Sequence, residues 1–256
     1  MVKQMKYAFY GKYQEEDKQK ITFLDYDEKN PDIVFSFGGD GTMLGAIHKY
    51  MDCVDKVKFV GIKTGSLGFF TDFEYQEFDQ AIEMIKNKEC KENKYKLLKF
   101  VFKNNNHKEI GYAVNEVSLV NPIHTQIIEV FIDGKLFEVF RGTGLLVSPP
   151  TGSTAYNKSL GGSIIDPKIE AFQLTEIAAI NNTVYNAISS PLILSKKTKL
   201  VLRTKESSNI YLSVDGKEYQ FTNLTETEVS LADKQVNIIS KKDTLFWDRV
   251  RKAFLR

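Results

Sequence analysis

One aspartate stands among three glycines in FSFGGDGTML, residues 35–44. Glycines lack a Cβ atom, so a ligand can lie against their backbone, and their N–H groups can face an anion. A loop that enters a helix N-terminus adds a partial positive charge, which also suits phosphate. An aspartate there repels phosphate unless a cation bridges them or a proton is exchanged. Asp40 is therefore predicted to be a Mg²⁺-associated group or the base that accepts a proton from an attacking hydroxyl.

The spacing of this loop does not match G-x-x-x-x-G-K-[ST], so it is not a P-loop. It does not match the dinucleotide-binding motif G-x-G-x-x-G either. The alternative interpretation is a tight turn in which Asp40 only caps the following helix.

A second stretch is rich in glycine and small hydroxyl residues, with RGTG at 141–144 and PTGSTAYNKSLGG at 150–162. These residues leave room for a flat ligand and offer short hydrogen-bond donors, and Tyr156 adds an aromatic face. The stretch predicts a ligand-binding segment.

Asn115 and Glu116 interrupt a β-type run. Neighbouring side chains on a strand point to opposite faces, so this pair shares a target only at a bulge or a strand end. A carboxylate that accepts from two ribose hydroxyls would explain the pair. A polar pair on an edge strand is the alternative.

The elements that position these residues change in character near residue 95. Before it, buried-type strands alternate with helix-like patterns, which is the βαβ pattern of an open α/β sheet. The predicted strands are 6–10, 33–37 and 57–62, and the predicted helices are 77–88 and a segment after Gly41 that Thr42 caps.

After residue 95 the pattern is one of short strands, with Asp133-Gly134 and Asp215-Gly216 as hairpin turns. The predicted strands are 112–120, 127–132, 210–214, 218–221 and 235–239. A helix is predicted at 169–179, and the amphipathic tail at 245–255 predicts a last helix that packs on the protein's own core.

The predicted fold is an α/β N-terminal domain with an open, mostly parallel sheet, followed by a β-rich, β-sandwich-like domain. We place the first at residues 1–94 with 243–256, so that the last helix returns to it, and the second at 95–242.

Composition excludes several classes of function. A formal net charge of +2 argues against nucleic acid as a partner. The N-terminus lacks the apolar core of a signal peptide, and no segment is apolar enough to span a bilayer, so a cytoplasmic protein without a membrane partner is expected. Cys53 and Cys90 lie far apart and are predicted free thiols. The three histidines form no ligand-spaced pair, so no protein-built metal site is predicted.

Taken in order, the motifs resemble those of the NAD kinase family. They are GGDGT at 38–42, GIKTGSLGFF at 61–70, NE at 115–116, RGTG at 141–144, PTGSTAYNKSLGG at 150–162, LTEIAAINN at 174–182 and SVDG at 213–216. GGDGT alone is shared with diacylglycerol kinases, sphingoid-base kinases and phosphofructokinases. TGSTAYNKSLGG together with NE is much more specific.

The resemblance implies phosphoryl transfer from ATP to the 2′-hydroxyl of the adenosine ribose of NAD, giving NADP; whether polyphosphate also serves as donor is open. It implies that Asp40 is the proton acceptor and that Asn115 and Glu116 hold the adenosine. It implies further nucleotide contacts from Gly38, Gly39, Gly41, Thr42, Phe69, Arg141, Thr143, Thr154, Ala155, Tyr156, Asn157, Lys158, Ser159 and Ala178. The implied cofactor is Mg²⁺ brought with ATP, and the implied assembly is a homodimer or homotetramer with its site near a subunit interface.

One position departs from the family pattern, since an aspartate usually stands where this chain has Thr143. Threonine can hydrogen-bond but lacks the charge, so weaker NAD binding is expected. Two other functions stay open. A lipid or sphingoid-base kinase would need an apolar pocket for acyl chains, and a non-catalytic NAD(P) sensor would fit Thr143.

Overall fold

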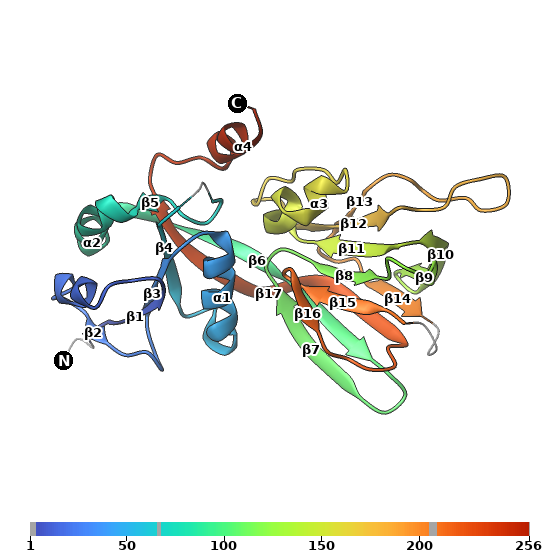
Figure 1. Cartoon of the computed structure of the whole chain (residues 1–256), viewed down its shortest axis with the longest axis horizontal. Coiled ribbons are helices and arrows are strands. Elements are labelled where there is room, and N and C mark those ends of the chain that lie inside the picture. Colours follow the sequence, from blue (N-terminus) through green and yellow to red (C-terminus); the bar gives the residue numbers. More distant parts are fainter. Residues whose placement is uncertain (1–3, 66–67, 205–208, 256) are drawn as a thin grey trace. The chain divides into compact units, whose positions relative to one another are not determined.

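A computed structural model describes residues 4–65, 68–204 and 209–255. The chain forms two compact units (Figure 1). Unit 1 comprises Met1–Tyr95 with Lys234–Arg256, and unit 2 comprises Lys96–Asp233. Ser66 and Leu67 of the GIKTGSLGFF motif lie outside the described residues.

Unit 1 is an open α/β sheet whose parallel strands follow the order β17-β4-β3-β1-β2, with β5 also parallel to β4. Its strands are β1 (Lys6–Gly11), β2 (Asp25–Tyr26), β3 (Ile33–Phe37), β4 (Lys58–Lys63), β5 (Phe73–Glu74) and the last part of β17 (Glu226–Lys241). Its helices are η1 (Glu15–Lys20), α1 (Asp40–Lys49), η2 (Met51–Cys53), η3 (Tyr75–Glu77), α2 (Phe78–Lys86) and α4 (Phe246–Phe254).

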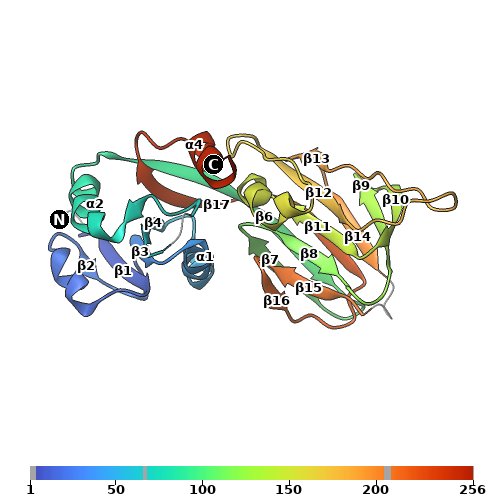
Figure 2. The same ribbon diagram turned by 45° about the horizontal axis from the view of Figure 1, so that its top comes forward.

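Strand β3 is buried along its whole length because helices cover both faces of the sheet. Figures 1 and 2 show α1 on one face and α2 on the other. Phe35 and Phe37 face α2, where their ring centroids lie 5.6 and 5.1 Å from that of Phe78. Because side chains alternate along a strand, Val34 and Ser36 face α1.

The arrangement of β1, β2 and β3 positions the glycine loop. Strand β2 lies on one side of β1 and β3 on the other, so the chain reverses its direction across the sheet here. Open α/β sheets bind ligands at the carboxyl ends of strands beside such a switch point. The loop at 38–41 leaves the carboxyl end of β3 there.

Unit 2 is a β-sandwich. One sheet is antiparallel with the order β13-β12-β11-β8-β15-β16; the other has the order β10-β9-β14-β17, with β6 paired to β17 and β7. Side chains from both sheets form one core, including Phe100, Ile128, Leu119 and Phe172.

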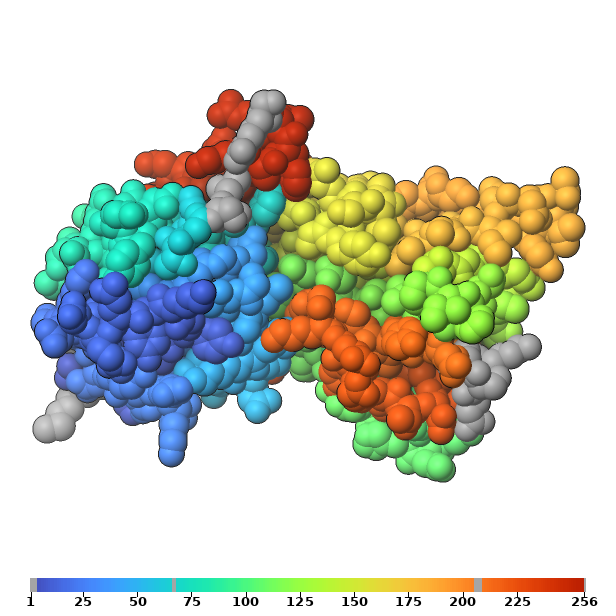
Figure 3. Space-filling view, viewed as in Figure 1, coloured from blue at the N-terminus to red at the C-terminus, as the bar shows by residue number. Residues whose placement is uncertain are grey.

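Strand β6 (Cys90–Lys103) begins in unit 1 and continues into unit 2. The remaining elements lie in unit 2 and are β7 (Lys108–Ala113), β8 (Val117–Val120), β9 (Gln126–Ile132), β10 (Lys135–Gly142), β11 (Gly144–Ser148), η4 (Pro150–Thr154), α3 (Tyr156–Ser159), β12 (Ala171–Ile177), β13 (Leu192–Ser195), β14 (Leu200–Thr204), β15 (Tyr211–Val214) and β16 (Lys217–Tyr219). The segment at 178–191, between β12 and β13, projects from this unit as a long loop (Figures 1 and 3).

The predicted class, an α/β unit followed by a β-rich unit, is confirmed. Both hairpin turns are also confirmed, since Asp133-Gly134 and Asp215-Gly216 have φ values of 48°, 79°, 51° and 73°, the positive values of a type I′ turn. The last helix is confirmed as α4 and belongs to unit 1.

Two predictions about helices are wrong. The helix predicted at 169–179 is strand β12, which is buried on both faces, and periodicity alone does not separate such a strand from a buried helix. Thr42 does not cap α1, which already begins at Asp40 with Gly39 as its N-cap. Within the described residues, no helix combines the length and apolarity that crossing a membrane requires.

Candidate functional site

The glycine loop is a close-packed turn that places Asp40 at the first position of α1. Backbone N–H groups of Thr42 and Met43 both donate to the Gly39 carbonyl, at 3.0 and 3.1 Å. A Cβ on Gly38 would lie 2.1 Å from Thr42 Oγ1, so only glycine fits there. Thr42 packs against Gly38 instead of capping the helix.

The Asp40 carboxylate is held by a different segment of unit 1. Its Oδ2 accepts the Phe69 N–H at 2.8 Å, and its Oδ1 accepts the Phe70 N–H at 3.0 Å. A Cβ on Gly68 would lie 2.5 Å from Oδ1, so the loop needs a glycine to approach this closely. Asp40 makes no side-chain cap on α1, and the interpretation of Asp40 as a simple helix cap is therefore wrong.

The surroundings of Asp40 make it a better proton acceptor than an exposed aspartate. Burial raises the pKa of Asp40 above its ordinary value, while the Phe69 and Phe70 N–H donors and the charge of Arg249 oppose that rise. Each carboxylate oxygen spends one lone pair on a backbone donor and keeps another. The group can accept a proton from a hydroxyl in reach without losing its support.

Phe69, one of the predicted nucleotide contacts, packs on the last helix. Its ring centroid lies 5.8 Å from that of Phe254 and 6.4 Å from that of Phe246. A pocket of about 430 Å³ lies at the carboxyl ends of β1 and β4, and Lys12, Lys63 and Thr64 are among its lining residues.

Asn115 and Glu116 lie in unit 2, in the short break between β7 and β8. The predicted strand at 112–120 is thus two strands. Asn115 and Glu116 lie at a strand end, which is a place where neighbouring side chains can contact the same ligand. The break is shaped by Asp215, whose carboxylate accepts the N–H groups of Val114, Asn115 and Glu116 at 2.9, 2.7 and 3.2 Å.

Asp215 belongs to the SVDG motif and to a predicted hairpin turn, but neither pattern predicts its support of the Asn115–Glu116 break. Its contacts lie 99 to 101 residues away, and no local pattern announces them. Within the turn itself, the signal is a carboxylate at the first central position, where asparagine and glycine serve equally well.

Two acceptor atoms of the Asn115–Glu116 pair are buried and have no hydrogen-bond partner within the described part of the chain, namely Asn115 Oδ1 and Glu116 Oε2. Burial and then the nearby Asp215 charge raise the pKa of Glu116 to about 7, against one N–H donor from Gly216. Buried acceptors without donors are costly. The pair is suited to accept hydrogen bonds from hydroxyl groups.

The start of the hydroxyl-rich segment packs directly on this pair. Thr151 donates to the Val114 carbonyl, and a Cβ on Gly152 would lie 1.7 Å from the Asn115 carbonyl oxygen. The structure therefore brings the 150–154 turn and Asn115–Glu116 together within unit 2.

Gly152→Ala is expected to lower the free energy of unfolding by about 1–3 kcal/mol, because an added Cβ overpacks this contact and forces the backbone to shift. Chemical denaturation measures the loss. Gly65→Ala is the matched control, since its Cβ meets no atom within 4 Å. Equal stability of Gly152→Ala and the wild type would contradict the packing described.

The predicted contacts at 154–159 divide by exposure. Tyr156 and Ser159 are exposed, and Thr154, Ala155 and Lys158 are half-buried. Asn157 is fully buried, and its Oδ1 accepts the Thr175 hydroxyl at 2.7 Å. Asn157 therefore ties α3 to β12, whereas the side chain of Tyr156 stands at the surface.

Arg141, Thr143 and Ala178 are adjacent at the base of the 178–191 loop. The Arg141 guanidinium carbon lies 4.4 Å from the centroid of the Tyr185 ring. Thr143 bridges strands through its backbone, donating to Ile177 and accepting from Asn121 at 3.0 and 2.8 Å. A Cβ on Gly142 would lie 2.7 Å from the Ala178 carbonyl oxygen.

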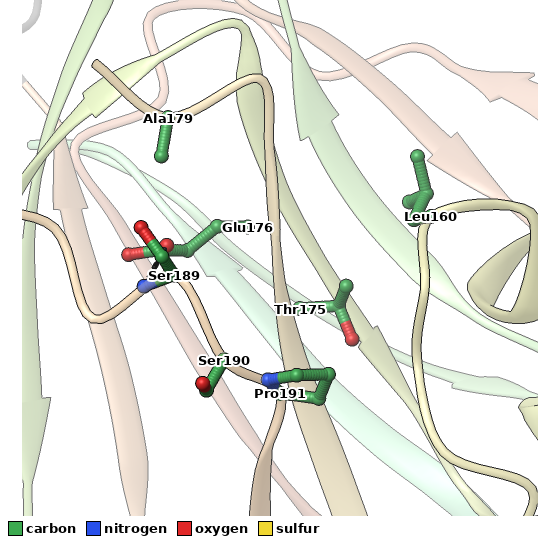
Figure 4. A pocket seen from close by; sticks show the side chains of 7 residues that line it. All are labelled: Leu160, Thr175, Glu176, Ala179, Ser189, Ser190 and Pro191. Carbon is green, nitrogen blue, oxygen red and sulfur yellow. Dashed lines mark hydrogen bonds between the residues drawn. The ribbon is translucent and has the colours of Figure 1, made fainter. Parts of the chain in front are cut away.

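A pocket of about 190 Å³ lies beside this group (Figure 4). It is lined by Leu160, Thr175, Glu176, Ala179, Ser189, Ser190 and Pro191. None of the predicted site residues lines it, although Leu160 and Ala179 directly follow two of them. Burial and the nearby Glu176 raise the pKa of Glu138 to about 8, so this carboxylate pair holds a proton near neutral pH.

Comparison with known proteins defines the class to which this fold and these motifs belong. The model of the ATP-NAD kinase N-terminal domain matches residues 3–90, and that of the ATP-NAD kinase C-terminal domain matches residues 114–241. The NAD kinase of Streptococcus agalactiae serotype Ia is 44% identical over 230 residues, covering 89% of this chain and 84% of that one. The NAD kinase of Streptococcus pyogenes serotype M3 is 43% identical, with 89% and 83% covered. The chain belongs to the ATP-NAD kinase family.

Solved structures share the fold. Yeast NADH kinase complexed with NADH superposes with a TM-score of 0.83 at 22% identity, over 99% of this chain and 88% of that one. The NAD kinase of Archaeoglobus fulgidus in complex with ATP gives 0.76 at 21% identity, over 98% and 97%.

Proposed function

We propose that this chain phosphorylates the 2′-hydroxyl of the adenosine ribose of NAD with ATP as donor, giving NADP and ADP. Membership of the ATP-NAD kinase family supports the reaction, and both streptococcal relatives are named NAD kinases. The observation that carries the mechanism is the Asp40 carboxylate. It is half-buried at the carboxyl edge of a parallel sheet and held by two backbone donors.

In this proposal Glu116 and Asn115 bind the adenosine ribose. Their buried acceptor atoms gain hydrogen bonds from sugar hydroxyls, which replaces the missing partners in the described structure. Thr154, Ala155, Tyr156, Lys158 and Ser159 line the remainder of the dinucleotide site, with Arg141, Thr143 and Ala178 at its other end. Asn157 contributes by holding α3 in place.

Asp40 accepts the proton of the 2′-hydroxyl as the phosphoryl group is transferred. Phosphoryl transfer passes through a loose transition state, so positioning and charge neutralisation supply most of the catalysis. The backbone at Gly38, Gly39 and Gly41, and Thr42 at the start of α1, meet the donor phosphates, which favour a helix N-terminus.

Mg²⁺ is part of the same proposal. No group of three or more metal-ligating side chains occurs in the parts of the chain that the structure describes. Asp40, which keeps a lone pair on each oxygen, would be the side chain to contact the ion brought with ATP. When bound, Mg²⁺ screens the charge of the donor phosphates.

We also propose a cytoplasmic homodimer or homotetramer. The 178–191 loop exposes apolar side chains, with Val184 73% exposed, and its Tyr185 stacks on Arg141 of the proposed dinucleotide site. The free thiols Cys53 and Cys90 suit a reducing compartment. Light scattering coupled to gel filtration measures the assembly, and a monomer at assay concentration would contradict it.

The proposal is tested by incubating the purified protein with NAD, ATP and Mg²⁺ and detecting product with an NADP-specific dehydrogenase. NADP formation supports it. Tight NAD binding without product would identify a dinucleotide sensor, and phosphorylation of a lipid or sphingoid base without NADP would identify a lipid kinase. The same assay with polyphosphate defines the donor.

The value of kcat/KM for NAD is expected to rise with pH through an apparent pKa near 7, because Glu116 has a pKa of about 7 and its ionised form is the stronger acceptor for the ribose 3′-hydroxyl. Below that pH the proton occupies an acceptor site, so binding weakens. Glu116→Gln is expected to abolish this limb of the kcat/KM profile and to lower the plateau. A limb that persists unchanged in Glu116→Gln would assign it to another group.

A further inference from the structure

The last helix reaches the 69–72 segment, which holds the Asp40 carboxylate, through one buried arginine. The Arg249 guanidinium forms a two-bonded pair with Asp72, with Nε–Oδ1 and Nη2–Oδ2 distances of 3.1 and 2.6 Å. Its Nη1 donates to the Phe69 carbonyl at 2.9 Å, and its Nη2 also reaches Ser240 Oγ at 3.3 Å. The side chains of Arg249 and Asp72 are only 8% and 7% exposed.

These contacts fall on the segment that holds the Asp40 carboxylate. Phe69 donates its N–H to Asp40 and presents its carbonyl to Arg249. The Phe69 ring also packs near Phe254 and Phe246 of α4. Backbone and side chain of residue 69 are thus fixed by the same helix, and Asp72 fixes the other end of the segment.

Helix α4 lies outside both matched family domains, which end at residues 90 and 241, and the space-filling view shows it on the surface of unit 1 (Figure 3). A helix needed only for packing would bury apolar side chains. This one also buries a charged side chain, Arg249, beside the apolar Val250, while Trp247 is 51% exposed.

We propose that Arg249 is a positioning residue for the reaction, which orients the Asp40 carboxylate through the 69–72 segment and so makes α4 part of the catalytic apparatus. The inference rests on the proposed function and adds Arg249 of the C-terminal helix α4 to the residues that support the reaction. Arg249 is suited to the task because its planar fork can bind one carboxylate and one carbonyl at fixed angles, which the single ammonium group of lysine cannot do.

The test compares Arg249→Met, Arg249→Lys and the control Arg251→Met in the full-length protein. Arg251 lies on the same helix and is exposed. We expect kcat for NADP formation to fall about 100-fold in Arg249→Met, as for a misplaced catalytic group. The KM of Arg249→Met for NAD is expected to stay within about 3-fold of the wild-type value. The kcat of Arg249→Lys is expected to lie between those of Arg249→Met and the wild type, and Arg251→Met is expected to match the wild type.

A second measurement separates positioning from a general loss of structure. If Arg249 acts through Asp40, adding Arg249→Met to Asp40→Asn produces little further loss of kcat, because the group that it positions is already disabled. Thermal unfolding of each variant establishes that it is folded. Should Arg249→Met fail to fold, the comparison is made with Arg249→Lys, which keeps the charge and the packed stem.

Three results would overturn the inference: wild-type kcat in a folded Arg249 variant, a loss confined to KM, or a full additional loss in the Asp40→Asn background. None of these touches the proposed function, which the wild-type protein tests by itself. If the wild type forms no NADP from NAD and ATP, the proposed function fails and this inference fails with it.

Discussion

Asp40→Asn is expected to lower kcat for NADP formation by about 10²–10⁴-fold, the range for loss of a general base. The amide keeps the size of the carboxylate but cannot accept the proton of the 2′-hydroxyl. Since Asp40 is not proposed to hold the dinucleotide, NAD affinity is expected to change little. Single-turnover rates and calorimetric titration with NAD measure the two effects separately.

Asp52→Asn is the matched control for this variant, because Asp52 lies in unit 1 and is exposed. It is expected to keep wild-type kcat. A folded Asp40→Asn protein with wild-type turnover would remove Asp40 from the mechanism.

Asp215→Ala is expected to lower the free energy of unfolding by about 3 kcal/mol or more and to weaken NAD binding strongly. It removes the acceptor for N–H groups of Val114, Asn115 and Glu116, and each buried donor left unpaired costs about 1–3 kcal/mol. The break that presents the Asn115–Glu116 pair then loses its support. Denaturant unfolding and NAD titration measure the two losses.

Asp215→Asn separates charge from hydrogen bonding. It retains one oxygen acceptor and removes the like charge that contributes to the raised pKa of Glu116. The limb of kcat/KM near pH 7 is therefore expected to move to lower pH. A limb that stays near pH 7, in a variant that still binds NAD, would show that Asp215 does not set the ionisation of Glu116.

Local chemistry explains which elements could be predicted from the sequence. Ile33–Phe37 is uniformly apolar and is β3, and both Asp-Gly pairs are turns because the positive φ values of a type I′ turn favour these residues. Strand β12 was predicted as a helix because it is buried on both faces, which removes the alternation that identifies a strand. The start of α1 was misplaced because Gly39, with no side-chain cap, serves as its N-cap.

The site was only partly accessible from the sequence. Asp40 can be predicted because it is an aspartate among glycines, and Asn115–Glu116 because it is a polar pair within a β-type run. Arg249 gives no such signal, and Asp215 is marked only by the SVDG motif and its turn, because each acts on a backbone segment about 100 or more residues away. Their roles depend on tertiary contacts that no local pattern encodes.

The most direct test of the account is a crystal structure of Asp40→Asn with NAD and a non-hydrolysable ATP analogue bound. We expect the residue 40 side chain within about 3 Å of the ribose 2′-oxygen, with Asn115 and Glu116 bonded to the same adenosine. A 2′-oxygen out of reach of residue 40, or an adenosine held by other side chains, would contradict the proposed chemistry.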